Sequence, residues 1–161
     1  MPLLPPRDRT PLDWAAEAVG TGFGSGLGPI APATWGTAAA LGIYWALGID
    51  GDSAAFFIIT ATVIVIGAAA AERLSVPGDL DPGRVVIDEW AGVLVTVAFL
   101  DNSFWWLFAG FWVFRVLDIA KPWPIRRLEK LHGGIGIMAD DIAAGIIGAI
   151  GLNVVRLIFF N

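Results

Sequence analysis

The sequence predicts an all-α, polytopic helical membrane protein with about five membrane-embedded helices and a cytoplasmic N-terminus. Three observations lead to this fold class: 57% of the 161 residues are hydrophobic, only 16% are charged, and the mean hydropathy is +0.72. Soluble domains carry about 25% charged residues, and a single core in a chain of this length cannot bury so much apolar surface. We therefore expect lipid to cover part of the molecule.

The composition also excludes several classes of function. Acidic residues outnumber basic ones by 15 to 10, which argues against a nucleic-acid partner. The chain has no cysteine, which excludes a disulfide framework, thiolate metal sites and cysteine nucleophiles. His132 is the single histidine, so phosphatase chemistry that needs two imidazoles is excluded as well.

Five apolar segments follow a polar beginning. Residues 1–19 are polar and rich in proline, and we expect a cytoplasmic N-terminal arm there, with residues 20–161 forming one helical membrane domain. The second segment has eighteen residues without a charge and is the clearest membrane-spanning helix. A tight turn is expected before it, at residues 50–53. The predicted spans are residues 35–49, with a flank back to residue 30, and residues 54–71, 85–100, 104–120 and 142–160.

Basic residues predict the orientation of these spans, because lysine and arginine in short loops stay on the cytoplasmic side. They fall before the first span, between the second and third, and between the fourth and fifth. The other two connections contain acids and no basic residue. The N-terminus is thus expected in the cytoplasm and the C-terminus outside. The basic residues concerned are Arg7, Arg9, Arg73, Arg84, Lys121, Arg126, Arg127 and Lys130.

Five carboxylates are predicted at the cytoplasmic ends of three spans. Ionisable groups in membrane helices are costly unless they are paired or bind cations, so they are functional candidates. A structural alternative is that acids in the first turn of a helix interact favourably with the helix dipole. This would explain all of the acids except Asp118. Asp118 lies at the C-terminal end of its span, where Arg115 could pair with it. The five are Asp88, Glu89, Asp118, Asp140 and Asp141.

Small residues near these acids favour their convergence on one site. Gly92 follows Asp88 by four residues and Gly145 follows Asp141 by four, a spacing that lets two membrane helices approach closely. Like charges brought into contact require a counter-ion. Because the chain lacks thiols and histidine clusters, an oxygen-ligated Mg²⁺ is the expected cofactor. The alternative interpretation is that these glycines serve only the close packing of the helices.

Two further elements could bind a phosphate group. The glycine-rich residues 20–37 can point backbone N–H groups of Gly24, Ser25 and Gly26 at an anion, or can simply form a close-packed loop before the first span. Pro122 should end the fourth span at Lys121. This places Lys121 and Arg115 beside the acids, where they could hold a phosphate, although a basic cytoplasmic flank needs no such function.

Four motifs in order resemble the phosphatidylglycerophosphatase A family: GTGFGSGLGPIAPATWGT, VVIDEWAG, FRVLDIAKPWPI and GGIGIMADDIAAG. The resemblance covers most of residues 20–145. It implies a Mg²⁺-dependent lipid phosphatase of the bacterial inner membrane that converts phosphatidylglycerophosphate to phosphatidylglycerol. The family's acidic residues match the five carboxylates above and its basic residue matches Lys121. One departure is visible, since relatives commonly have glycine where this chain has Ala33, directly before Thr34.

Residues and resemblance lead to one mechanistic hypothesis. Carboxylates from three helices hold Mg²⁺ at the cytoplasmic face, and the metal activates a water for attack on phosphorus. An aspartyl-phosphate intermediate is the rival. A small membrane transporter and a phosphotransferase acting on CDP-linked alcohols are the alternative functions. The expected catalytic residues are Asp88, Glu89, Asp118 and Asp141, the expected metal ligands are these four and Asp140, and the expected phosphate-binding residues are Lys121, Arg115, Gly24, Ser25, Gly26 and Thr34.

Overall fold

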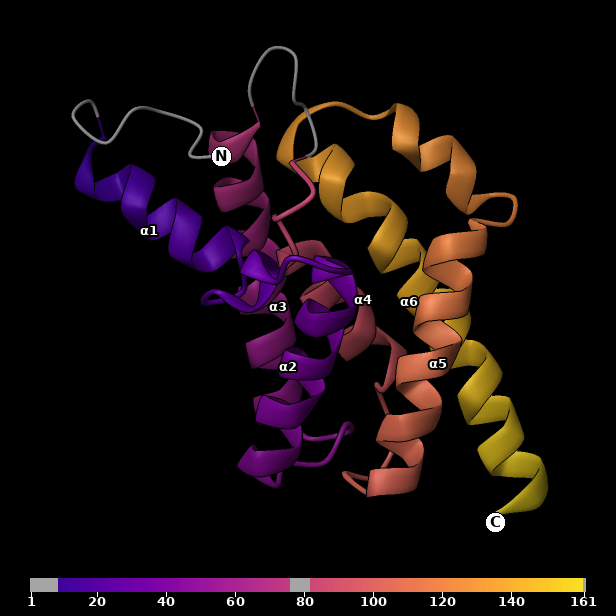
Figure 1. Ribbon diagram of the computed structural model, residues 1–161. Coiled ribbons are helices and arrows are strands. Elements are labelled where there is room, and N and C mark those ends of the chain that lie inside the picture. Colours follow the sequence, from indigo (N-terminus) through magenta and orange to yellow (C-terminus); the bar gives the residue numbers. More distant parts are fainter. Residues whose placement is uncertain (1–8, 76–81, 161) are drawn as a thin grey trace.

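The computed structural model describes residues 9–75 and 82–160, and within these ranges every regular element is a helix. This confirms the all-α class. Figure 1 shows the helices in order along the chain. They are α1 (Pro11–Gly20), η2 (Ser25–Leu27), α2 (Pro32–Leu47), α3 (Ala54–Leu74), α4 (Ile87–Thr96), α5 (Phe104–Ala120), η3 (Ile125–Lys130) and α6 (Gly133–Phe159).

Helices α3 and α6 are long and apolar enough to cross a membrane, with 21 and 27 residues. Only 28% and 22% of their most apolar stretches are buried inside the protein, so most of this apolar surface points outward. The core helix of a soluble protein would be mostly buried instead. Together with the overall composition, these two helices support the expectation of a membrane protein.

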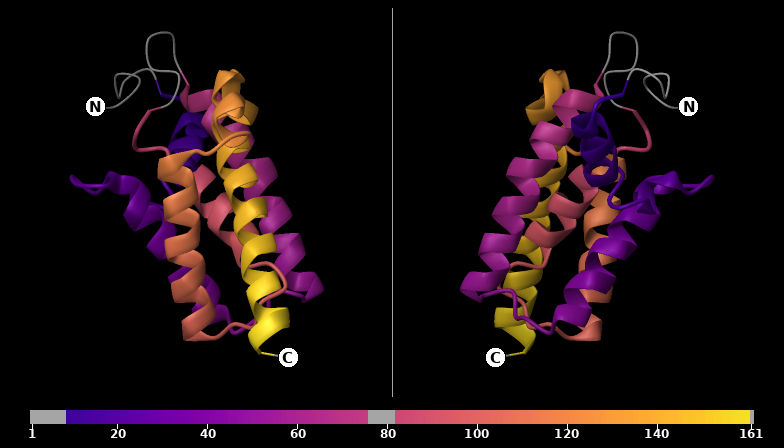
Figure 2. Two further views of the ribbon diagram at one scale, coloured as in Figure 1. Left: turned by 90° about the vertical axis from the view of Figure 1, so that its right-hand side faces the viewer. Right: turned by 90° about the vertical axis from the view of Figure 1, so that its left-hand side faces the viewer.

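The expected span at residues 85–100 is wrong. Helix α4 has ten residues and is about 15 Å long, half of the hydrocarbon thickness. It lies between the longer helices (Figures 1 and 2), and Val86, Ala91 and Val93 are completely buried. Its apolar residues thus pack against protein rather than lipid. Helix α5, with 17 residues, runs beside α6, and α2, with 16 residues, packs against α4 and α5; five spans are not confirmed.

The chain reverses directly after α4. Phe99 adopts a left-handed conformation with φ of 65°, and its N–H donates to the carbonyl of Gly51 over 2.8 Å. The N–H of Gly51 donates in return to the carbonyl of Leu100 over 2.9 Å. These two bonds join the turn after α4 to the α2–α3 turn, which falls at the expected residues 50–53 and fixes where α4 stops.

Part of the expected N-terminal arm is helical. Helix α1 begins with a capping box between Thr10 and Asp13, with Pro11 at its first position. The guanidinium of Arg73 donates to Asp13 over 2.7 Å and so ties α1 to the end of α3. Residues 1–8 of the expected arm lie outside the described residues.

Helix α6 begins at Gly133, nine residues before the expected start of the fifth span. A carboxylate oxygen of Glu72, near the end of α3, accepts the N–H of Gly134 over 2.5 Å and satisfies one of the free donors at this helix end. Asp140 and Asp141 consequently lie two turns inside α6. The first-turn dipole explanation is therefore wrong for these two acids, while Asp88 and Glu89 do occupy the first turn of α4.

Candidate active site

Three buried carboxyl groups converge at the centre of the molecule. Asp88 and Glu89 come from α4 and Asp141 from α6, and one oxygen of each lies within 4.8 Å of the others. Their exposed fractions are only 8%, 9% and 4%. The Oε2 atom of Glu89 is buried and has no hydrogen-bond partner. We call these three residues the carboxylate cluster.

Close contact between α4 and α6 produces this convergence, as the glycine spacing predicts. A Cβ atom on Gly92 would lie 2.7 Å from the carbonyl oxygen of Asp141, and one on Gly145 would meet the carbonyl of Gly92. A side chain at either position would force the helices apart. The glycines therefore set the distance between the carboxyl groups of the two helices.

Asp118 of α5 lies beside the carboxylate cluster. It lies close enough to interact with Glu89 and Asp141. Arg115, one turn earlier on α5, donates to Asp118 over 2.7 Å, and both side chains are largely buried. The expected ion pair is confirmed, and it places a guanidinium beside the acids.

Lys121 and Asp140 form a second ion pair at the edge of the cluster. The Lys121 Nζ atom lies 2.6 Å from a carboxylate oxygen of Asp140. Helix α5 ends at Ala120, as Pro122 predicts, and Lys121 takes a left-handed conformation with φ of 40°. This sharp end directs the chain toward η3 and brings the lysine to α6.

The glycine-rich loop packs against the start of α4 and the segment that precedes it. The N–H of Val86 donates to the carbonyl of Gly20 over 2.8 Å, and Gly26 packs on Arg84 and Val86. The amides of Gly24, Ser25 and Gly26 donate to Thr21 and Gly22 inside the loop, so they are already engaged in this conformation. The close-packed loop that the sequence analysis gives as one interpretation is present, and anion binding by these amides stays a prediction.

Thr34 and Ala33 belong to the first turn of α2, outside the carboxylate cluster. Ala33 is helical, so the glycine common among relatives at this position is not required here for a left-handed backbone. The left-handed residue is Ala31, with φ of 50°. The structure therefore brings together the acids and the two basic residues, while the phosphate-binding role of Gly24, Ser25, Gly26 and Thr34 stays a prediction.

Sequence reasoning missed Glu72, which fixes the start of α6. Its partner is a backbone N–H more than sixty residues away in the sequence, and the three glycines at residues 133–136 favour a loop rather than a helix. No local pattern marks this residue. Only the packing of α3 against α6 reveals its role.

The donors in the cluster suit a hard divalent cation. They are carboxylate oxygens, the ligand type that Mg²⁺ and Ca²⁺ prefer. Several buried carboxylates in contact are destabilising unless a positive charge compensates them. The orphaned oxygen of Glu89 provides a ligand position that the protein itself does not use. The residues present thus fit the expected metal.

Comparison with known proteins identifies the relatives of this chain. The family model of phosphatidylglycerophosphatase A matches residues 18–156. The chain is 42% identical to the Escherichia coli phosphatidylglycerophosphatase A over 139 residues, which cover 84% of this chain and 79% of the relative. For the Haemophilus influenzae phosphatidylglycerophosphatase A, the identity is 40% over 136 residues, with 80% and 81% covered.

A third relative carries a different name. A Bacteroides thetaiotaomicron protein named "Putative phosphatidylinositol-3-phosphatase" is 40% identical over 145 residues, which cover 86% of this chain and 91% of the relative. No solved structure matches the chain. All three names describe phosphatases.

Proposed function

Since the chain belongs to the phosphatidylglycerophosphatase A family and is a phosphatidylglycerophosphate phosphatase, we propose that the carboxylate cluster is its Mg²⁺-dependent active site. The observation that carries this proposal is the convergence of Asp88, Glu89 and Asp141 in a buried position. Asp118 completes the set as a further ligand or as a base. Asp140, which pairs with Lys121, is the remaining candidate ligand.

The reaction breaks the bond between the terminal phosphorus and the oxygen of the head-group glycerol. Water supplies the hydroxyl that forms the new bond to phosphorus, and the leaving glycerol oxygen takes up a proton. The products are phosphatidylglycerol and inorganic phosphate. When bound, Mg²⁺ would supply positive charge for the phosphate and lower the pKa of water.

The chain's own residues bind and orient the substrate in this proposal. Lys121 and Arg115 are held beside the cluster by Asp140 and Asp118, so their positive charges can attract the phosphate dianion into an otherwise acidic site. A carboxylate of the cluster accepts the proton of the attacking water as general base. An aspartate that attacks phosphorus directly is the rival route.

The site is proposed to face the cytoplasm of a bacterial inner membrane. The C-terminal ends of α3 and α5 lie toward the same end of the molecule as η3, whereas the α2–α3 turn and the turn before α5 lie at the opposite end (Figure 1). The first group carries Arg73, Lys121 and Arg126, and the two turns carry Asp52 and Asp101. Basic residues mark the cytoplasmic side. Because the chain has no cysteine, Asp52→Cys and Arg126→Cys can be labelled separately with an impermeant maleimide in intact cells. We expect labelling of the Asp52→Cys protein alone; the reverse pattern would contradict this orientation.

The experiment that tests the reaction is phosphate release from phosphatidylglycerophosphate in detergent, with Mg²⁺ and with chelator. The comparison is between the wild type, Asp88→Asn and the control Asp52→Asn, which changes an exposed acid in the α2–α3 turn. We expect Mg²⁺-dependent release by the wild type and the control, and none by Asp88→Asn. Undiminished release by a folded Asp88→Asn protein would refute the proposed site.

The same assay separates the other candidates. Phosphatidylinositol 3-phosphate is included as a second substrate because of the name of the Bacteroides relative. Transfer from a CDP-linked lipid would release a cytidine nucleotide, and transport would appear as ion flux in vesicles. Flux or nucleotide release in place of phosphate release would favour these alternatives.

A further inference from the structure

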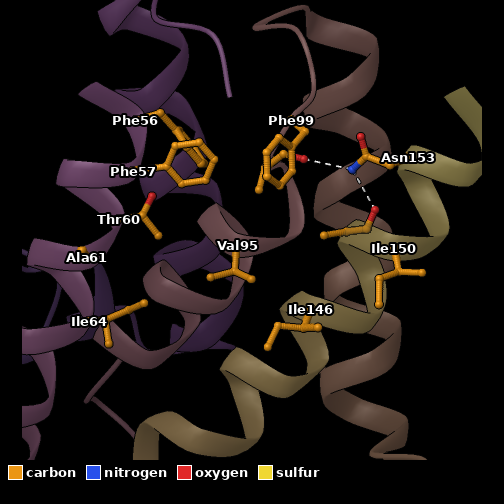
Figure 3. A pocket seen from close by; sticks show the side chains of 12 residues that line it. Phe56, Phe57, Thr60, Ala61, Ile64, Val95, Phe99, Ile146, Ile150 and Asn153 are labelled. Atoms are coloured by element: carbon orange, nitrogen blue, oxygen red, sulfur yellow. Dashed lines mark hydrogen bonds between the residues drawn. The ribbon is translucent and has the colours of Figure 1, made fainter. Parts of the chain in front are cut away.

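An apolar groove lies between α3 and α6, beside the last turn of α4. Its volume is about 520 Å³, and its walls come from α3, from α6, and from α4 with the turn that follows it. Figure 3 shows the side chains that face one another across it. They include Phe57 and Ile64 on one wall, Val95 and Phe99 on the floor, and Ile146 and Ile150 on the other wall.

The shortness of α4 explains why the groove exists. Helices α3 and α6 are in close contact near the cluster, where a Cβ on Gly67 would lie 2.9 Å from Ile87 and 3.2 Å from Met138. Helix α4 fills the space between them only as far as Thr96. Beyond Thr96 only the turn at residues 97–99 covers the floor, and the space between the two long helices stays open.

Two polar side chains line the groove, and they differ in their hydrogen bonds. The amide nitrogen of Asn153 donates to the carbonyls of Ala98, over 3.0 Å, and Ala149, over 2.8 Å (Figure 3). The hydroxyl of Thr60, by contrast, is buried and has no hydrogen-bond partner.

Thr60 differs from three other helical threonines of this protein. Thr37, Thr62 and Thr96 each donate to the carbonyl four residues earlier. A buried hydroxyl without a hydrogen-bond partner lowers the stability of a protein. The Thr60 hydroxyl is therefore a candidate donor to an acceptor that enters the groove.

The surroundings of the groove favour an acyl chain as its occupant. It lies along the two helices that are apolar enough to cross the bilayer, where acyl chains are the surrounding solvent.

The groove is also close to the cluster. Val95 follows Glu89 by six residues and Ile146 follows Asp141 by five, so the groove begins about 8–9 Å along the helices from the carboxylates. A terminal phosphomonoester at the cluster is joined to the acyl esters through two glycerol units and a phosphodiester. This linkage can reach from the cluster to the near end of the groove.

We propose that the groove binds an acyl chain of the phospholipid substrate and that the Thr60 hydroxyl donates to an ester carbonyl of that lipid. This inference rests on the proposed function, because it places the reacting phosphate at the carboxylate cluster. It assigns Thr60, Ala61 and Ile146 to substrate binding.

The first test fills the groove. Ala61→Trp places an indole in it, whereas the control Val65→Trp changes an exposed residue one turn away that does not line it. The substrates are dioleoyl phosphatidylglycerophosphate and its soluble head-group analogue without acyl chains. We expect Ala61→Trp to lower kcat/KM for the lipid by about tenfold and to leave the analogue unaffected, with no effect of Val65→Trp on either. Equal effects of the two tryptophans on the lipid, or an equal loss with the analogue, would overturn the proposal.

A second measurement does not depend on catalysis. A phosphatidylglycerol with a photoreactive diazirine in its acyl chain is crosslinked to the wild-type protein in nanodiscs, and the labelled peptides are mapped. We expect label at residues 56–64 and 146–153, lost in Ala61→Trp and kept in Val65→Trp. Label in the groove without any phosphate release would contradict the proposed function and leave the groove assignment standing. Label confined to other surfaces, or crosslinks between two copies through the groove, would overturn the assignment of the groove to an acyl chain.

The Thr60 contact has its own test. Thr60→Val keeps the shape of the side chain and removes the hydroxyl. We expect KM for the ester lipid to rise by roughly threefold, and no change for an ether-linked analogue, which lacks the carbonyl acceptor. The same change in KM for both lipids would exclude the ester contact.

Discussion

The ammonium nitrogen of Lys121 lies 2.6 Å from a carboxylate oxygen of Asp140, which joins the end of α5 to α6 beside the carboxylate cluster. The Asp140 side chain is only 10% exposed and the Lys121 side chain 28%. The pair therefore compensates one acid in a region where several others lie close together, and it orders the sharp turn that ends α5.

Removing the positive charge of this pair should destabilise the fold. Lys121→Met keeps most of the hydrocarbon stem and leaves Asp140 buried without its partner. We expect a loss of about 1–3 kcal/mol, below the value for a fully buried pair because the lysine is partly exposed. Thermal unfolding in detergent measures the effect. The double variant Lys121→Met/Asp140→Asn should recover part of the stability, and additive losses would show that the two groups are not coupled.

Neutralising a cluster acid should stabilise the metal-free protein. Asp88, Glu89 and Asp141 crowd buried negative charge together, so Asp141→Asn relieves repulsion in the absence of a cation. We expect its Tm in chelator to exceed that of the wild type. The control Asp52→Asn, in an exposed turn, should leave Tm unchanged.

With Mg²⁺ present, the Tm of the wild type should exceed that of Asp141→Asn. At a concentration one hundred times its Kd, a ligand adds about 2.7 kcal/mol to the stability of the protein that binds it. The Tm of the wild type should therefore rise with Mg²⁺, while that of Asp141→Asn stays nearly constant. A rise of the same size in both proteins would show that the cluster is not the metal site.

Sequence patterns predicted the helical class and the main acids well, because both depend on local composition. The turn at residues 50–53, the end of α5 at Pro122 and the Arg115–Asp118 pair also follow from neighbouring residues. The apolar run at residues 85–100 was misleading, since burial in protein and burial in lipid select the same residue types. Only the surrounding helices show that α4 is covered by protein.

Long-range contacts explain the remaining differences. The glycines at residues 133–136 disfavour a helix, yet Glu72 and the close packing on α3 start α6 there, so tertiary contacts override local propensity. A glycine-rich loop can expose its N–H groups or use them internally, and the sequence does not distinguish these possibilities. Here Thr21 and Gly22 accept them.

The close approach of α4 and α6 should not tolerate a methyl group at Gly145. A Cβ there would lie 3.0 Å from the Cβ of Val95 and would also meet the carbonyl of Gly92, both on α4. We expect Gly145→Ala to cost about 1–3 kcal/mol through overpacking and to lower activity by separating Asp141 from Asp88. Gly151→Ala, on the same helix with open space around it, should be neutral or slightly stabilising. Thermal unfolding and phosphate release measure both effects, and equal behaviour of the two variants would contradict the proposed helix contact.

Glu72 should control the metal site from a distance through the start of α6. Its carboxylate accepts the N–H of Gly134, two turns before Asp141 on the same helix. Glu72→Ala removes this acceptor and should cost about 1 kcal/mol, as loss of an N-terminal cap does, while Glu72→Gln keeps an acceptor and should retain most of the stability. Because a frayed start lets α6 shift against α4, we also expect the alanine variant to need more Mg²⁺ for half-maximal stabilisation. A lower Tm with unchanged Mg²⁺ dependence would mean that Glu72 supports the fold without positioning Asp141.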